Sequence, residues 1–145
     1  MGSDASPRPS KMAIVLTEDS ADKLLPFATL ASGAVALGME VHVFASYWGL
    51  VAFRARPTAS EAHVSPGHGE EGARLEQALK AKNAPSWRRI LEMAKSLGEL
   101  HIYACSQSVD LLGLKKEDLD PLVESVTGVA TFVDRTRDAS VTYFI

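Results

Sequence analysis

The sequence predicts an α/β protein whose single domain is a flavodoxin-like three-layer sandwich with a mostly parallel sheet. Met12 to Leu16 is a short, continuous apolar run, which is typical of a strand buried on both faces. From Asp22 to Leu37 apolar residues recur at helical spacing, and Gly38 is placed to end that helix. Val41 to Ala45 reads as a second strand. Strand, helix and strand therefore follow within about 35 residues, as in a right-handed parallel crossover.

The rest of the chain continues this alternation of strands and helices. Leu100 to Ala104 is the third apolar strand, and the β-branched and aromatic run Val141 to Ile145 is the last one. Apolar spacing and cap residues predict helices of various lengths at Tyr47–Phe53, Leu75–Ala81, Ser86–Leu97 and Lys116–Ser125, and a strand-to-helix turn at Cys105–Ser108 with a short helix after it to Leu112. Val126–Val133 fits a strand or a helix by its pattern, and a helix at 128–137 is favoured.

Length and composition bound the organisation of the protein. A chain of 145 residues, 46% of them hydrophobic, has room for one domain with a proper core. Residues 1–10 are polar and carry two prolines, so we expect a disordered tail there, followed by one domain at 11–145. The proline- and glycine-bearing segment at about 56–72 has hardly any large apolar residue, which predicts a mobile loop within that domain.

Charge and hydropathy exclude several partners. The net charge is −3 with no basic run, so nucleic-acid binding is not expected. No apolar stretch approaches the roughly 20 residues that cross a bilayer, and the first ten residues do not resemble a signal peptide. We therefore expect a cytoplasmic protein without membrane insertion.

The single cysteine, Cys105, follows the third strand directly. One cysteine excludes an internal disulfide, a Cys-x-x-Cys pair and a cysteine-rich zinc site. Ligands of parallel α/β sheets meet the carboxyl ends of the strands, and a flavodoxin-like order would put that crevice between the first and third strands. The polar or aromatic residues that follow the first three strands are supporting candidates: Thr17, Glu18, Tyr47, Trp48, Ser106, Gln107 and Ser108.

The position of Cys105 suggests a reactive thiol. Backbone N–H groups at the start of a helix stabilise a thiolate and would also hold a persulfide or an oxyanion. Acidic residues at Glu18, Asp19 and Asp110 act in the opposite direction if they lie nearby. The alternative is that Cys105 is a small buried hydrophobic residue, as a lone cysteine in an α/β core often is.

Spacing argues against other cysteine chemistries. A phosphatase loop needs an arginine six residues after the cysteine, where this chain has Leu111. A peroxiredoxin-type thiol needs a threonine three residues before it, where Ile102 stands. His42 and His101 lie inside strands and are expected to be structural rather than bases for a cysteine hydrolase.

Metal and cofactor sites are not expected either. His63 and His68 fall in the predicted loop and on no helix, which favours a solvated loop over a metal site. The first strand ends in an acidic turn without glycine, where the pyrophosphate of a dinucleotide would bind poorly. No cofactor is expected.

Several segments together resemble the DsrE/DsrF/DrsH-like family, which includes DsrE/TusD-like sulfur-relay proteins and members labelled peroxiredoxin-like. The resemblance covers nearly everything after residue 10 and is carried by five segments, the last of which closes the chain: Lys11–Val15, Leu37–Val41, Phe44–Leu50, Ala104–Asp110 and Val129–Ile145. The histidine- and glutamate-bearing middle loop departs from relatives that are rich in methionine and glycine there.

The resemblance implies a flavodoxin-like sandwich assembled into homo-oligomers, trimers or hexamers. It further implies a sulfur carrier or sulfurtransferase in which a cysteine at the place of Cys105 takes sulfane sulfur from a rhodanese or a TusA-like carrier as a persulfide and passes it on. Two alternatives remain: a non-catalytic oligomeric or small-ligand-binding subunit of sulfur metabolism, and a redox-sensing or peroxiredoxin-like thiol protein.

Overall fold

A five-stranded sheet forms the centre of the computed structural model, which describes residues 8–55 and 64–145. The strands are β1 (Lys11–Leu16), β2 (Glu40–Ala45), β3 (Leu100–Cys105), β4 (Val123–Thr127) and β5 (Val141–Phe144). Their order across the sheet is β4-β3-β2-β1-β5, and all four neighbouring pairs are parallel. The predicted single α/β domain with a parallel sheet is thereby confirmed.

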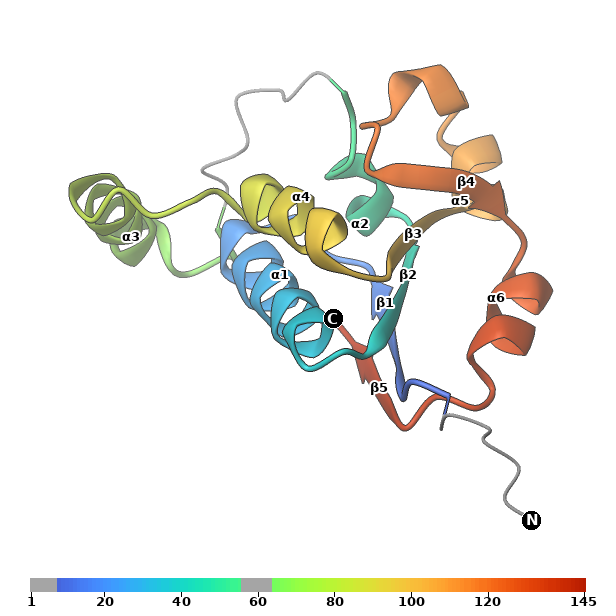
Figure 1. Cartoon of the computed structure of the whole chain (residues 1–145). Helices are drawn as coiled ribbons and strands as arrows, with labels where there is room; N and C mark the ends of the chain where they lie inside the picture. The colour runs from blue at the N-terminus through green and yellow to red at the C-terminus, as the bar shows by residue number, and fades with distance from the viewer. Residues whose placement is uncertain (1–7, 56–63) are drawn as a thin grey trace, which may run out of the picture.

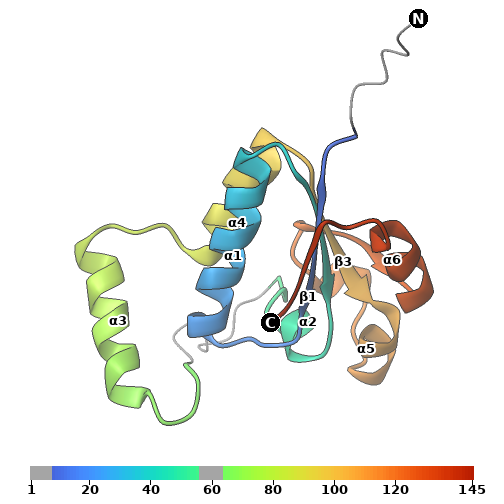
Figure 2. The same cartoon turned by 90° about the horizontal axis from the view of Figure 1, so that it is seen from below.

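Helices cover both faces of this sheet, as Figures 1 and 2 show. The helices α1 (Ala21–Ala36) and α4 (Trp87–Leu97) pack on one face, while α5 (Ser106–Leu111) and α6 (Val129–Thr136) lie on the other side. The short α2 (Trp48–Val51) follows β2. The larger core lies under α1 and α4. A smaller cluster of Ala13, Phe44, Tyr103, Cys105 and Phe132 lies between the sheet and α6.

The two long helices form where the sequence predicts them, for identifiable local reasons. α1 is followed by Gly38 at φ 77°, a left-handed conformation that glycine adopts without steric cost and that commonly ends helices. α4 begins at Ser86, whose hydroxyl oxygen accepts a hydrogen bond from the Arg89 N–H at 3.2 Å. Together these helices bury the apolar stripes that the sequence spacing indicates.

The segment Lys116–Ser125, predicted as a helix, is instead a single 3₁₀ turn (Lys116–Asp118, η2) followed by β4. The helix prediction was wrong because pairing with β3 decides the conformation here. Val123 pairs with Ile102 and Thr127 with Cys105, and both Val123 and Thr127 are buried. The helix predicted at 128–137 is confirmed as α6.

The middle of the chain is more helical than predicted. The helix α3 spans Gly69–Ala81, so it begins inside the segment predicted as a loop at 56–72. Glu70 and Glu71 in its first turn favour a helix start, a signal that the glycine content obscured. No residue of α3 is buried, and Figure 2 shows the helix standing away from the sandwich. The part of the loop at 56–63 and most of the predicted tail lie outside the described residues.

No helix in the part of the chain that the structure describes combines the length and apolarity needed to cross a membrane.

Candidate functional site

The strand order changes which strand ends meet at the carboxyl edge of the sheet. β2 lies between β1 and β3, so the crevice expected between the first and third strands does not exist. Cys105, the last residue of β3, instead neighbours the end of β2 on one side and pairs with Thr127 of β4 on the other. The residues directly after β2, β3 and β4 therefore form the surroundings of the thiol.

The thiol of Cys105 is enclosed by hydrogen-bond donors. Cys105 is 6% exposed, and burial raises the pKa of its thiol. Hydrogen bonds from the hydroxyl and the N–H of Ser108 act in the opposite direction, joined by those from the Ser46 hydroxyl and the Gln107 N–H. The donors outweigh burial, so the pKa of Cys105 lies below its ordinary value because they stabilise the thiolate.

Ser108 is fixed as a donor toward this thiol. Its side chain is completely buried, and its hydroxyl oxygen accepts a hydrogen bond from the Tyr47 N–H at 2.9 Å. Because that oxygen only accepts in the bond from Tyr47, its own hydrogen remains available for the hydrogen bond that lowers the pKa of Cys105. The Ser108 hydroxyl thus links the Cys105 thiol to the backbone of the turn between β2 and α2.

The turn between β2 and α2 is strained at Tyr47. Tyr47 has φ 50° and ψ −118°, a conformation that glycine usually adopts, and the Gly49 N–H donates to the Ser46 carbonyl at 2.9 Å. Gly49 lies so close to β1 that a Cβ built on it would stand 2.1 Å from the carbonyl oxygen of Leu16. The same carbonyl accepts the Ser46 N–H at 2.9 Å, so the turn that carries Ser46 and Tyr47 is held against the end of β1.

The residues predicted beside Cys105 fall into two groups. Ser106 and Gln107 are exposed at the start of α5, and Ser108 is buried against the thiol. Tyr47 and Trp48 follow β2 with exposed fractions of 43% and 55%. Thr17 and Glu18 lie one strand further away, beyond β2.

Thr17 belongs structurally to the β5 side of the sheet. Its N–H and hydroxyl both donate to the Ile145 carbonyl, at 2.6 and 3.2 Å. Glu18 is exposed. Neither residue hydrogen-bonds to the thiol or its donors in the described contacts.

Sequence reasoning missed three residues of this edge. Ser46 is the first residue after β2, is buried and donates to the thiol. Thr127 and Gly128 close the end of β4, and a Cβ on Gly128 would lie 3.9 Å from the Ser106 hydroxyl. Ser46 could have been found by taking every strand end as a candidate. Thr127 and Gly128 could not, because β4 itself was not predicted.

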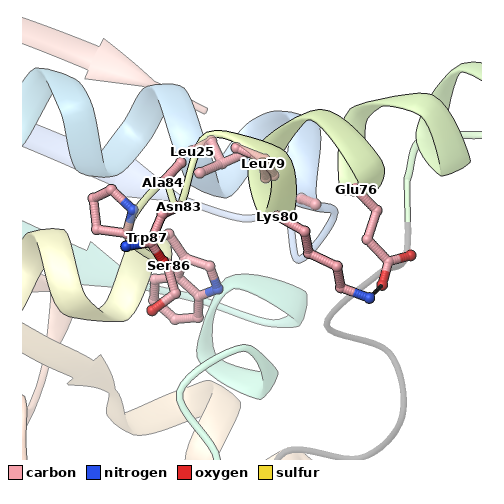
Figure 3. Close-up of a pocket in the computed structure, with 10 residues that line it drawn as sticks. Leu25, Glu76, Leu79, Lys80, Asn83, Ala84, Ser86 and Trp87 are labelled. Atoms are coloured by element: carbon pink, nitrogen blue, oxygen red, sulfur yellow. Dashed lines mark ion pairs between the residues drawn. The ribbon is translucent and has the colours of Figure 1, made fainter.

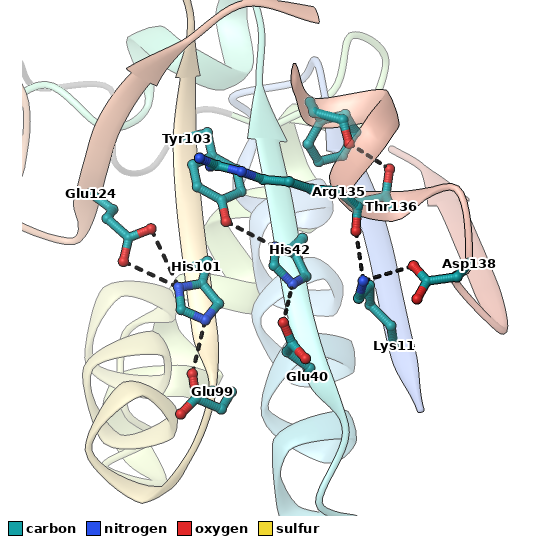
Figure 4. A network of polar contacts seen from close by, with 11 residues as sticks. Lys11, Glu40, His42, Glu99, His101, Tyr103, Glu124, Arg135, Thr136 and Asp138 are labelled. Atoms are coloured by element: carbon teal, nitrogen blue, oxygen red, sulfur yellow. Dashed lines mark hydrogen bonds and ion pairs between the residues drawn. The ribbon is translucent and has the colours of Figure 1, made fainter. Parts of the chain in front are cut away.

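A second polar cluster lies on the same face of the sheet, toward the amino ends of the strands (Figure 4). His42 Nε2 lies 2.7 Å from Glu40 Oε1, and Nδ1 lies 2.8 Å from the Tyr103 hydroxyl. A carboxylate can only accept, so Nε2 carries the hydrogen and Nδ1 accepts from Tyr103. Burial lowers the pKa of His42 below its ordinary 6.5, although Glu40 pulls it upward. His42 is therefore a structural histidine, as its place inside a strand predicts.

His101 stacks on His42 with ring centroids 5.0 Å apart. Its Nε2 lies 2.9 Å from a Glu99 oxygen and its Nδ1 lies 3.1 Å from Glu124 Oε1. Because both nitrogens face carboxylates, His101 joins β3 to the bulge of β4 rather than serving the thiol.

Buried His42 makes stability depend on pH with a definite sign. Its folded-state pKa is depressed, so the unfolded chain binds the proton first, and stability falls as pH drops below about 6.5 until the folded pKa is passed. Urea unfolding between about pH 7.5 and about pH 5.5 measures how the free energy of unfolding changes with pH. The contribution of His42 to this slope is at most about 1.4 kcal/mol per pH unit for one proton, and His42→Gln should remove it. The exposed substitution Gln77→Ala on α3, which removes no titratable group, should keep the parental slope. Equal slopes in the parent and in His42→Gln would contradict the assignment.

A hollow of about 440 Å³ lies on the opposite side of the molecule, between the start of α1, the end of α3 and the start of α4 (Figure 3). Leu25, Leu79 and Trp87 supply its apolar wall. Neither Cys105 nor any residue predicted to support it lines this hollow.

Among residues 8–55 and 64–145, no three histidine, cysteine or acidic side chains are grouped so that they could hold a metal ion. His68 is exposed just before α3, and His63 lies outside the described residues.

The fold and the edge site define a small parallel α/β sandwich with one thiol at the carboxyl edge of its sheet. Comparison with known sequences identifies the family of this sandwich. The chain matches the sequence model of the DsrE/DsrF/DrsH-like family over residues 8–72 and 67–144, and it belongs to that family. The resemblance noted in the sequence is thereby confirmed.

Relatives of known name cover nearly the whole chain. The sulfur carrier protein DsrE2 of Allochromatium vinosum is 27% identical, with 93% of this chain and 98% of that protein covered. The uncharacterized protein YrkE of Bacillus subtilis is 25% identical, with 93% and 96% covered. Among solved structures, the protein of unknown function MTH1491 from Methanobacterium thermoautotrophicum shares the fold with a TM-score of 0.56 at 13% identity. That match covers 92% of this chain and 98% of that one.

Proposed function

We propose that this protein is a cytoplasmic sulfur carrier or sulfurtransferase that holds sulfane sulfur as a persulfide on Cys105 and passes it to a partner protein. Family membership and similarity to a protein named as a sulfur carrier support the sulfur-relay assignment. The observation that carries the site assignment is the set of donors around Cys105, whose hydrogen bonds lower the pKa of its thiol despite burial. Donors of this kind stabilise a thiolate and equally a persulfide anion.

The transfer needs no cofactor and no external oxidant. The Cys105 thiolate attacks the outer sulfur of a donor persulfide, the donor's sulfur–sulfur bond breaks, and the donor leaves as a thiolate. A second exchange of the same kind passes the outer sulfur to an acceptor thiolate. A rhodanese or a TusA-like carrier is the proposed partner, and the proposed assembly is a trimer or hexamer. Ser106, Gln107 and Ser108, with Tyr47 and Trp48, are the proposed surroundings of the transferred sulfur.

Mass spectrometry of the intact chain tests this proposal directly. After incubation with polysulfide, or with thiosulfate and a rhodanese, the parent protein should gain about 32 Da per added sulfur. Cys105→Ala should gain none. Ser96→Ala, which removes an exposed hydroxyl of α4 outside the proposed site, should be labelled like the parent. A parent protein that is folded by circular dichroism and stays unlabelled under both conditions would refute the carrier function.

The burial of Cys105 favours a second candidate, a non-catalytic subunit in which the cysteine only fills the smaller core cluster. Because Cys105 as a whole residue is only 6% exposed, a donor protein reaches its thiol only when the residues around it move. Alkylation of the folded protein separates the two candidates. A carrier should react with iodoacetamide well below the denaturation midpoint, whereas a packing cysteine should react only at the rate of global unfolding.

A further inference from the structure

The two edges of the sheet differ in how they are protected against pairing with another strand. Soluble proteins guard edge strands with charges, prolines, bulges or a covering element, because an open edge presents unpaired N–H and C=O groups. The β4 edge has two of these features. Its register against β3 shifts between Ile102 and Tyr103, and Glu124 stands at the shift.

The β5 edge has none of them within the described residues. Its pairing with β1 runs from Val141 to Phe144 without a register shift, and no other described strand lies beyond it (Figure 1). Residues 139–145 contain no charged residue and no proline. Phe144 is 77% exposed and Tyr143 39%, so two aromatic side chains lie open on this edge strand.

We propose that β5 is an interaction surface for a second copy of this chain, paired edge to edge and antiparallel about a two-fold axis. Such a contact is self-complementary, since the same strand supplies both sides. The absence of charged side chains in 139–145 argues for self-pairing, because a strand that meets its own copy within this segment then opposes no like-charged side chains. The exposed aromatics add apolar area to the backbone hydrogen bonds.

The surface is separate from the thiol site and does not depend on the proposed sulfur chemistry. β5 and β3 are separated by β1 and β2, so a partner on β5 adds to the far end of the sheet from Cys105. Pairing therefore leaves the thiol of each copy as it is in the single chain, and the two hypotheses can fail independently.

Sedimentation velocity of the full chain over a wide range of concentration tests the proposal. Phe144→Lys places a charge on the edge and should halve the mass of the largest assembly, from two chains to one or from six to three. Tyr143→Lys provides a second, independent disruption. Leu97→Lys is the matched control, since Leu97 is 80% exposed on α4, away from the edge, and should leave the mass unchanged.

Circular dichroism melting confirms that each variant folds, and alkylation of Cys105 should proceed at the parental rate in Phe144→Lys. A parent protein that stays a single chain at every concentration would overturn the proposal. So would an assembly, such as a trimer, whose mass both edge variants leave unchanged.

Discussion

Gly49→Ala should destabilise the protein by about 3 kcal/mol or more and lower its melting temperature by about 10 °C or more. A Cβ at this position would stand 2.1 Å from the Leu16 carbonyl oxygen and 2.6 Å from its carbon. Backbone atoms of a central strand cannot move aside as a flexible side chain can. Either α2 or the end of β1 must shift, and the hydrogen bond from Ser46 to the same carbonyl is disturbed with it.

Gly33→Ala is the matched control for this substitution. Gly33 lies exposed within α1, and a Cβ there would meet nothing within 4 Å. Removing glycine from a helix interior should stabilise the protein by roughly 0.5–1 kcal/mol. Thermal melting of the two variants should therefore show opposite signs for the same chemical change. If Gly49→Ala has the same melting temperature as the parent, the turn after β2 does not pack against the end of β1.

Ser108→Ala should move the pH midpoint of Cys105 alkylation upward and slow the reaction roughly threefold to tenfold at neutral pH. The substitution removes a donor hydroxyl that lowers the pKa of the thiol, while burial, which raises it, remains. The Tyr47 N–H loses its acceptor at the same time, so the strained turn loses one of its restraints. The midpoint is the decisive readout, since a looser turn alone would change the rate without changing the titration.

The control for Ser108→Ala is Ser106→Ala, two residues earlier on the same short helix. Ser106 is exposed and is not among the donors to the thiol, so its removal should leave the midpoint in place. Melting curves of both variants separate an effect on the thiol from a general loss of packing. If the two variants titrate alike, Ser108 does not stabilise the thiolate.

Patterns local to the chain predicted most of the fold. Continuous apolar runs located β1, β2 and β3, and helical spacing with a stopping glycine located α1 and α4. β4 escaped prediction because it is short and only alternately buried, so its conformation depends on a neighbour about 20 residues earlier in sequence. The order of the strands lies beyond any local pattern, since nothing in a strand's own residues says which strand it pairs with.

The candidate site was predicted in part for the same reason. Cys105 and the residues directly after it are located by one strand end and needed no knowledge of topology. Ser46 reaches the thiol because β2, not β1, is the neighbour of β3. The dual bonding of Ser108 depends on an unusual φ at Tyr47, a non-glycine residue that no sequence pattern assigns to a left-handed conformation.

The division of the interior into two clusters has a consequence for how this architecture can diversify. Cys105 belongs to the smaller one, with Phe44, Tyr103 and Phe132, whereas the larger one holds most of the buried aliphatic side chains on the opposite side of the strands. Substitutions around the thiol therefore draw on a minor share of the folding free energy. Residues around Cys105 can therefore be exchanged at a smaller cost in stability than residues of the larger cluster.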